Sequence, residues 1–253
     1  MRTSDFQFPL PSDLIAQRPA PRRDQSRLMV VRRQEGTFDH QSFIDLPDFL
    51  LAGDVLVLNN SRVIPARLRG VNVRHGGEFE LLLLEEGGAG ANDWWAMVRP
   101  GKRARLNTQL VLKNRRGEST GVIATVIGQN PEGHRRLRFS GTNNIRVLLD
   151  SIGEVPLPPY IRRTRVERLD EDARRYQTVY AQADAAGSVA APTAGLHFTG
   201  PLLEKIRALG VQTCFVTLHV GLGTFAPVKA QTLDRHVMHE ERYRVSPETA
   251  QVV

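Results

Sequence analysis

Several features that would place the protein in a special class are scarce or missing. Cys214 is the single cysteine among 253 residues, which excludes an intrachain disulfide and is typical of a reducing cytosol. No run of about 18 apolar residues occurs, so we expect no membrane-spanning helix. The first residues hold no apolar segment of the signal-peptide kind. A cytoplasmic location is therefore expected.

Acidic side chains are absent from one long stretch. Between Arg99 and Arg116 the chain carries seven basic residues and no acidic one, and the whole chain has a formal net charge of +7. Clustered lysines and arginines are typical of a surface that follows the phosphate backbone of a nucleic acid. A solvated hairpin face would carry the same pattern, so charge alone leaves both interpretations open.

Long helical periods are also missing from residues 63–156. Short β-like runs follow one another there, separated by turn signals such as Gly76-Gly77 and Gly87-Gly88. Strands at this spacing, with no helix between them, favour a small antiparallel barrel or sandwich. The chain is long enough to hold a second domain as well.

The segment before residue 63 predicts strands joined by polar loops. Residues 28–31 are expected to form a buried strand with 37–43 as its hairpin partner. The apolar run 55–58 is typical of a strand that is covered on both faces. It ends on the polar cluster 59–62, a place where ligand groups are often held. The charged residues 22–27 favour a solvated loop.

Histidines gather near glycines in residues 187–243. Four of the chain's seven histidines lie in this span, which opens with the small-residue run 187–199. Glycines let the backbone approach a ligand closely. A helix is expected next, with Thr199 or Gly200 as its cap, Pro201 in its first turn and Gly210 at its end. A strand over 211–220 should follow and carry His219 near its end. This combination indicates a ligand site.

Three familiar chemistries fit parts of this span. The run Gly221-Leu222-Gly223-Thr224-Phe225-Ala226 has the dinucleotide fingerprint, but Pro227 follows where a helix should begin. His236 and His239 would need a third ligand to hold zinc, and their order is neither the zincin motif nor its inverse. Ser188 lacks the context of an esterase nucleophile. Taken by chemistry alone, catalytic and structural histidines are equally open.

Longer motifs resemble those of one enzyme family. The opening motifs are Leu14-Ile15-Ala16-Gln17, Ser26-Arg27-Leu28, Gly53-Asp54 with Val57-Leu58-Asn59, and Pro65-Ala66-Arg67-Leu68. The middle motifs are Val155-Pro156-Leu157-Pro158-Pro159-Tyr160-Ile161 and Tyr176-Gln177-Thr178-Val179-Tyr180-Ala181. The most distinctive are Ala190-Ala191-Pro192-Thr193-Ala194-Gly195-Leu196-His197-Phe198 and Thr217-Leu218-His219-Val220-Gly221-Leu222-Gly223-Thr224-Phe225. By these motifs the chain resembles the S-adenosylmethionine:tRNA ribosyltransferase-isomerases of queuosine biosynthesis.

This resemblance implies a fold and a reaction. The fold would be an α/β main domain, residues 1–62 and 157–253, with an inserted small antiparallel β-barrel over 63–156. The enzyme would move the ribosyl part of S-adenosylmethionine onto 7-aminomethyl-7-deazaguanine at the wobble position of tRNA. Rearrangement would give epoxyqueuosine and release adenine and methionine. S-adenosylmethionine would be a co-substrate, with no permanently bound cofactor and no metal. The oligomeric state stays open, with a monomer expected.

The resemblance also implies roles for particular residues. Three histidines are candidates for the acid and base, and a carboxylate could orient one of them: His197, His219, His239 and Glu241. The expected substrate-binding residues are Thr193, Gly195, Asn59, Arg62, Arg67, Tyr160, Tyr176, Gly221, Gly223 and Thr224. Contact with tRNA phosphates is expected from Arg99, Lys102, Arg103 and Arg105, and Tyr160 or Tyr176 would stack on a base. Which histidine is base and which is acid stays open.

One departure from the family concerns length. Family members continue well past Val253, so we expect the C-terminal part of the α/β domain to be missing from this sequence, although Ser246 predicts the cap of one more helix. The activity of such a fragment is an open question. Two other classes stay open beside the enzyme: a metal-dependent hydrolase that uses the four histidines, and a non-catalytic RNA-binding module.

Overall fold

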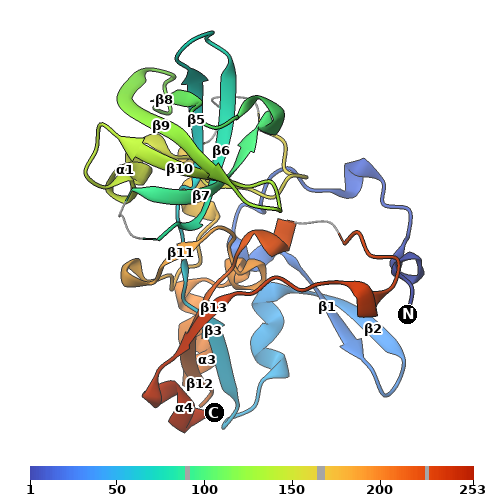
Figure 1. Cartoon of the computed structure of the whole chain (residues 1–253). Helices are drawn as coiled ribbons and strands as arrows, with labels where there is room; N and C mark the ends of the chain where they lie inside the picture. Colours follow the sequence, from blue (N-terminus) through green and yellow to red (C-terminus); the bar gives the residue numbers. More distant parts are fainter. Residues whose placement is uncertain (89–91, 164–168, 226–227) are drawn as a thin grey trace. The chain divides into compact units, whose positions relative to one another are not determined.

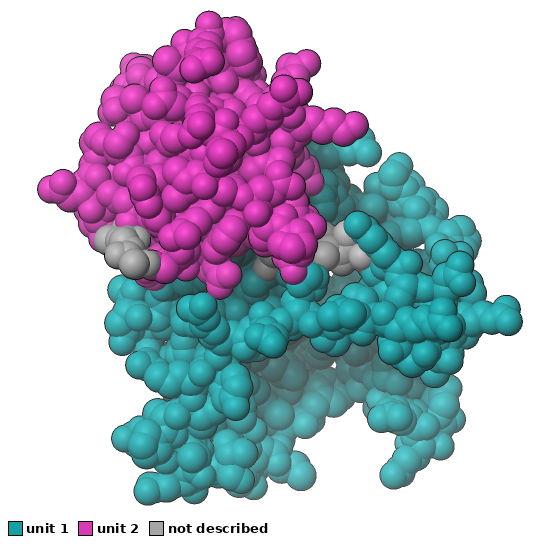
Figure 2. All heavy atoms as spheres, in the orientation of Figure 1, with its two compact units in different colours: residues 1–62, 159–162, 175–253 teal, residues 63–158, 163–174 magenta. Residues whose placement is uncertain are grey.

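The computed structural model describes residues 1–88, 92–163, 169–225 and 228–253 (Figure 1). The chain divides into two compact units, coloured separately in Figure 2. Unit 1 comprises Met1–Arg62, Pro159–Arg162 and Arg175–Val253, and unit 2 comprises Val63–Pro158 and Arg163–Arg174. In the described part of the chain, no helix combines the length and the apolar character needed to cross a membrane.

Unit 2 is built on a closed barrel of six antiparallel strands (Figure 1). Their order around the barrel is β10-β7-β6-β5-β8-β9. The strands are β5 (Arg67–Asn72), β6 (Glu78–Glu86), β7 (Asp93–Arg99), β8 (Gln109–Lys113), β9 (Ser119–Gln129) and β10 (Arg135–Ser140). Closure leaves no free sheet edge. The predicted antiparallel barrel is thus confirmed.

Apolar side chains from every second strand position fill the interior of this barrel. In β5 every second residue is buried, and the same period-2 pattern continues in β6, β8 and β9. The fully buried side chains include Leu68, Leu81, Leu83, Leu110, Leu112, Val122, Val126 and Leu137. Helix α1 (Ile145–Ile152) buries Ile145, Leu149 and Ile152, and α2 spans Leu169–Arg175. A core made within one barrel predicts that unit 2 is stable by itself.

Unit 1 contains a mixed sheet of three strands in the order β13-β12-β3. Strand β12 (Gln212–His219) runs parallel to β3 (Val55–Asn59) and antiparallel to β13 (Arg242–Val245). Helix α3 (Gly200–Ala208) packs on this sheet, and α4 spans Pro247–Val252. The core consists of Phe43, Leu58, Phe198, Leu202, Leu203, Ile206 and Val211. The main unit is therefore of the α/β type, as expected.

The ends of α3 follow the predicted signals. The Thr199 hydroxyl accepts a hydrogen bond from the Leu202 N–H, and proline occupies the first turn. The chain leaves the helix through Gly210, whose φ of +84° is the left-handed conformation that glycine adopts without strain. Ser246 likewise caps α4 by accepting from the Thr249 N–H.

Two expectations about burial in unit 1 are wrong. Strand β3 is an edge strand, and Val55 and Val57 are 38% and 44% exposed, so its second face is not covered. The hairpin of β1 (Arg27–Arg32) and β2 (Thr37–Ser42) forms as predicted, but Met29 and Val31 are 58% and 60% exposed. A two-stranded ribbon packs only one face on the core, here through Leu28.

The remaining elements are short. Strand β4 is Arg62–Val63 and β11 is Ala186–Ser188. The 3₁₀ helices are η1 (Thr3–Phe6), η2 (Ser12–Leu14), η3 (Arg23–Gln25), η4 (Phe43–Phe49), η5 (Gly101–Arg103), η6 (Ala183–Ala185), η7 (Thr193–His197), η8 (Leu222–Phe225) and η9 (Leu233–Arg235).

Candidate active site

The carboxyl ends of β3 and β12 carry Asn59 and His219. Because the strands are parallel, both residues lie at the same edge of the sheet. The Asn59 side chain binds both backbone polar groups of Leu218. Asn59 Oδ1 accepts from the Leu218 N–H at 3.1 Å, and Asn59 Nδ2 donates to the Leu218 carbonyl at 2.9 Å. Oδ1 also accepts from the Ser61 N–H at 3.0 Å. Asn59 therefore holds the backbone next to His219, and its predicted role as a substrate ligand stays a prediction.

A buried hydroxyl pair lies behind this strand end. Ser61 and Ser188 are both fully buried, and their Oγ atoms are 2.6 Å apart. Ser188 Oγ also accepts from the Val220 N–H at 3.1 Å, so β11 fixes the residue that follows His219. A Cβ on Gly187 would lie 2.9 Å from His219 Nδ1, which leaves room only for glycine. The small-residue run thus packs directly against the ring of His219.

A second polar contact set continues along the same strands. The Asn60 side chain accepts from Thr217 Oγ1 at 2.8 Å and donates to Gln182 Oε1 at 2.9 Å. Asn60 and Thr217 are buried, so these bonds satisfy polar groups that would otherwise destabilise the fold. Sequence reasoning named the cluster 59–62 but did not separate its roles, because adjacent residues point to opposite sides of a strand.

His197 lies at the end of η7 in a different environment. Its ring packs at 5.2 Å from the ring of Phe43 and is half-buried. Burial lowers the pKa of His197 below its ordinary value, and a hydrogen bond to the backbone of Arg23 opposes that shift. The histidine is therefore neutral at pH 7, the form that accepts a proton.

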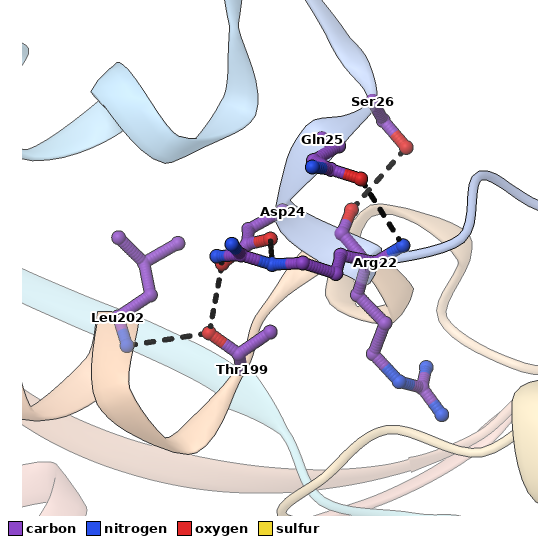
Figure 3. Close-up of polar contacts among 7 residues, drawn as sticks. Arg22, Asp24, Gln25, Ser26, Thr199 and Leu202 are labelled. Atoms are coloured by element: carbon purple, nitrogen blue, oxygen red, sulfur yellow. Dashed lines mark hydrogen bonds and ion pairs between the residues drawn. The ribbon is translucent and has the colours of Figure 1, made fainter.

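The backbone of Arg23 forms a hydrogen bond with this histidine. The expectation of a solvated loop around Arg23 is wrong at Asp24 (Figure 3). Asp24 is 3% exposed, and its carboxylate accepts two hydrogen bonds from the Arg22 guanidinium at 3.2 and 3.0 Å. It also accepts from the Thr199 hydroxyl at 3.3 Å. A buried carboxylate needs such partners, and one of them, Thr199, is 175 residues away in the sequence.

The loop after β12 lies beside residues 239–241. The Gly221 N–H donates to Glu241 Oε1 at 3.0 Å. A Cβ on Gly223 would lie 2.8 Å from the Cβ of His239, which is exposed. Glu241 contacts backbone in this structure, so its predicted task of orienting a histidine stays a prediction. Thr224 is exposed on the same loop.

Gly195 and the predicted tyrosines occupy distinct places. A Cβ on Gly195 would lie 2.3 Å from the Tyr180 hydroxyl, so a close approach requires the glycine. Burial raises the pKa of Tyr176 to about 12, and its ring is 7% exposed. Tyr160 is 54% exposed, and Gln17 holds its backbone by donating to its carbonyl at 3.0 Å. Of the two, Tyr160 has the free ring face that stacking on a base needs.

Other predicted ligands are at the surface or in unit 2. Thr193 and Arg62 are exposed in unit 1. Arg67 belongs to unit 2, where it is half-buried and its Nη2 donates to the Leu157 carbonyl at 3.3 Å. Within the residues that the structure describes, no group of three or more His, Cys, Asp or Glu side chains is placed to hold a metal ion.

The basic residues predicted to contact tRNA lie at the last residue of β7 and on the connection from β7 to β8. Arg99, Lys102, Arg103 and Arg105 are all exposed. Beneath them Arg135, 8% exposed, donates to the carbonyls of Ala104 at 2.6 Å and Gly101 at 2.8 Å. Sequence reasoning missed Arg135 because nothing local distinguishes it from the arginines beside it on β10.

The comparisons with known proteins agree with one another. Residues 3–253 match the family model described as queuosine biosynthesis protein. The S-adenosylmethionine:tRNA ribosyltransferase-isomerase of Thermoanaerobacter sp. (strain X514) is 46% identical over 253 residues, which are 100% of this chain and 70% of that protein. The protein of the same name from Clostridioides difficile (strain 630) is 48% identical over 250 residues, 99% of this chain and 69% of that protein.

A solved structure is similar as well. The S-adenosylmethionine tRNA ribosyltransferase of Thermotoga maritima is 32% identical, with a TM-score of 0.38, and the match covers 98% of this chain and 64% of that chain. This chain thus spans just under two thirds of the solved one. From the family model and the curated relatives, the chain belongs to the queuosine biosynthesis family of S-adenosylmethionine:tRNA ribosyltransferase-isomerases.

Proposed function

We propose that the chain moves the ribosyl part of S-adenosylmethionine onto 7-aminomethyl-7-deazaguanine at the tRNA wobble position. The rearranged product is epoxyqueuosine, and adenine and methionine leave. Beyond family membership, one observation carries this proposal: His219 lies at the carboxyl end of β12 against Gly187, and Asn59 holds the backbone of the preceding residue, Leu218. Ligands of open α/β sheets bind at such strand ends.

The histidines suit the chemistry of a sulfonium donor. The positive sulfur acidifies the hydrogens on the adjacent C5′, so a neutral imidazole can remove one and start the rearrangement. His197 is our candidate for this base, because burial lowers its pKa and keeps it neutral at pH 7. Adenine leaves more readily when it is protonated, and His219 or His239 is our candidate for that acid.

The substrate contacts follow from accessibility. Thr193 and Arg62 are exposed, so their side chains are free to reach ribose hydroxyls or a carboxylate. Gly195, Gly221 and Gly223 let backbone approach the donor, and the exposed ring of Tyr160 is placed to stack on a base. S-adenosylmethionine acts as a co-substrate and is not retained after turnover.

We assign tRNA binding to the barrel. Arg99, Lys102, Arg103 and Arg105 present four exposed cations on one connection, and each phosphate they neutralise releases a counterion. Unit 1 would then hold the catalytic residues and unit 2 the tRNA backbone. The reaction on tRNA also implies a cytoplasmic enzyme.

Turnover is the direct test. The protein is incubated with S-adenosylmethionine and tRNA that carries the aminomethyl deazaguanine, and adenine release and tRNA nucleosides are followed by mass spectrometry. Adenine and epoxyqueuosine in equal amounts are expected. His219→Ala should lower kcat by about 10²-fold or more, since general acid–base catalysis contributes about 10² to 10⁴.

Two controls make the result specific. His40→Ala removes an exposed histidine of the β1–β2 hairpin and should leave turnover unchanged. The same tRNA with ordinary guanine should yield no adenine. Full turnover by His197→Ala and His219→Ala together would contradict the assignment of both residues.

A further inference from the structure

We propose that Arg23 and Asp24 are positioning residues that hold His197 in one orientation and one tautomer. The inference rests on the proposed function for the role of His197 in catalysis. Its structural part stands on contacts of the segment Arg22–Ser26, which we call the His197 clasp.

Arg23 binds the backbone of Leu196, the residue just before the histidine. Its Nη1 donates to the Leu196 carbonyl at 3.0 Å and to the Arg175 carbonyl at 3.2 Å. Its own backbone forms a hydrogen bond with the His197 ring. That bond favours the protonated imidazole, so a ring nitrogen is the donor and the Arg23 carbonyl is the acceptor. One residue therefore contacts two neighbouring positions, 196 and 197.

Asp24 binds the side chain of Thr199, two residues after the histidine. Its carboxylate accepts from the Thr199 hydroxyl at 3.3 Å, and Thr199 in turn caps α3 through the Leu202 N–H at 3.3 Å (Figure 3). Arg22 neutralises the buried carboxylate through two hydrogen bonds. The clasp thus ties both sides of His197 to one short turn, η3.

This arrangement has a consequence for proton transfer. The imidazole packs at 5.2 Å from the ring of Phe43, and it also forms the hydrogen bond with the Arg23 backbone. A ring N–H committed to the Arg23 carbonyl leaves the other nitrogen unprotonated in the neutral form. A catalytic base needs that lone pair aimed at the reacting hydrogen, and small misplacements are costly. The His197 clasp would hold the imidazole in that orientation.

The test removes the guanidinium donors of Arg23 and keeps an unbranched side-chain stem. Arg23→Met loses the bonds to Leu196 and Arg175, and Asp24→Asn removes the charge that pairs with Arg22. Asp48→Asn, at an exposed aspartate of unit 1, is the matched control. The ring nitrogens of His197 are observed by long-range ¹H–¹⁵N spectra, with His197→Ala to assign the signal, and kcat and KM are measured separately.

We expect wild type and Asp48→Asn to show one neutral tautomer, and Arg23→Met and Asp24→Asn to show a mixture of two. The kcat of Arg23→Met should fall about 10²-fold with the KM for S-adenosylmethionine unchanged. In a His197→Ala background, Arg23→Met should cause no further loss, because it acts through that ring.

Two results would overturn the proposal: a single tautomer that survives in Arg23→Met, or kcat losses that multiply in the double variant. If Arg23→Met does not fold, Arg23→Lys keeps one cationic donor and takes its place. If the wild type turns over no substrate, the proposed function has failed, and the ring spectra still decide whether the clasp orients His197.

Discussion

At the scale of single residues, the site depends on places where no side chain fits. Gly187 and Gly223 lie directly against His219 and His239, and Gly195 lies against the Tyr180 hydroxyl. Each of these glycines has a close neighbour on a different segment. Their role is therefore steric, and a methyl group at Gly187 or Gly223 must displace a histidine that the proposed function uses.

Gly187→Ala provides the test of this reading. The added Cβ would meet His219 Nδ1 at 2.9 Å, so the ring must shift, and kcat should fall by about 10²-fold. Gly200→Ala is the matched control, because a Cβ there meets nothing within 4 Å. Steady-state turnover and thermal melting are measured for both. Unchanged turnover in Gly187→Ala would show that the position of His219 is not critical.

The pKa of His197 predicts a pH effect on stability. Because burial lowers this pKa below 6.5, the unfolded chain binds more protons than the folded one just below that pH. The stabilisation from burying the neutral imidazole is fully present above pH 6.5. It is lost as the pH falls from 6.5 towards the lowered pKa of His197. Melting temperatures between about pH 5 and about pH 7.5 should decline less for His197→Gln than for the wild type. Parallel curves for the two proteins would contradict the burial effect.

At the scale of elements, short connections do the positioning that regular strands and helices do not. The turn η3 holds η7 through Arg23 and the N-cap of α3 through Asp24, and Asn59 holds the end of β12. In the barrel, Arg135 binds the carbonyls of the β7–β8 connection that presents the basic residues. In each case a buried or part-buried polar side chain binds a polar group of a segment distant in sequence.

Arg135→Gln should weaken tRNA binding more than the loss of one charge explains. The carbonyls of Gly101 and Ala104 lose their donor, so the basic connection loses its fixed shape and stability falls by about 1–3 kcal/mol. Arg74→Gln, which removes one exposed charge from the same unit, is the control. Filter binding at several salt concentrations separates the two effects. Equal losses in both variants would mean that only charge matters.

At the scale of the whole molecule, two cores of different kinds share one chain. The barrel closes on its own interior, whereas unit 1 packs one helix and several 3₁₀ turns on a three-stranded sheet. The net charge of +7 suits a polyanionic substrate, and the basic connection lies entirely within unit 2. Each unit can therefore be tested for its own part of the proposed function.

The segment Val63–Pro158 should fold alone, because the buried leucines and valines of the barrel come from its own strands. We expect it to bind tRNA with an affinity that falls steeply with salt, and to show no binding of S-adenosylmethionine. Circular dichroism, thermal melting and titration calorimetry test these points. A folded segment without affinity for tRNA would remove the basic connection from the proposal.

Local rules account for what the amino-acid sequence by itself determined. Alternation with period 2 predicted the barrel strands, and Thr199, Pro201 and Gly210 marked the ends of α3, because these signals act between near neighbours. Family motifs identified the chain. Tertiary structure alone decided that Asp24 is buried, that Asn59 bonds to Leu218, that Arg135 supports the basic connection and that β3 is an edge. Each of these depends on partners distant in sequence, and burial of a polar group becomes favourable only once those partners have been brought together.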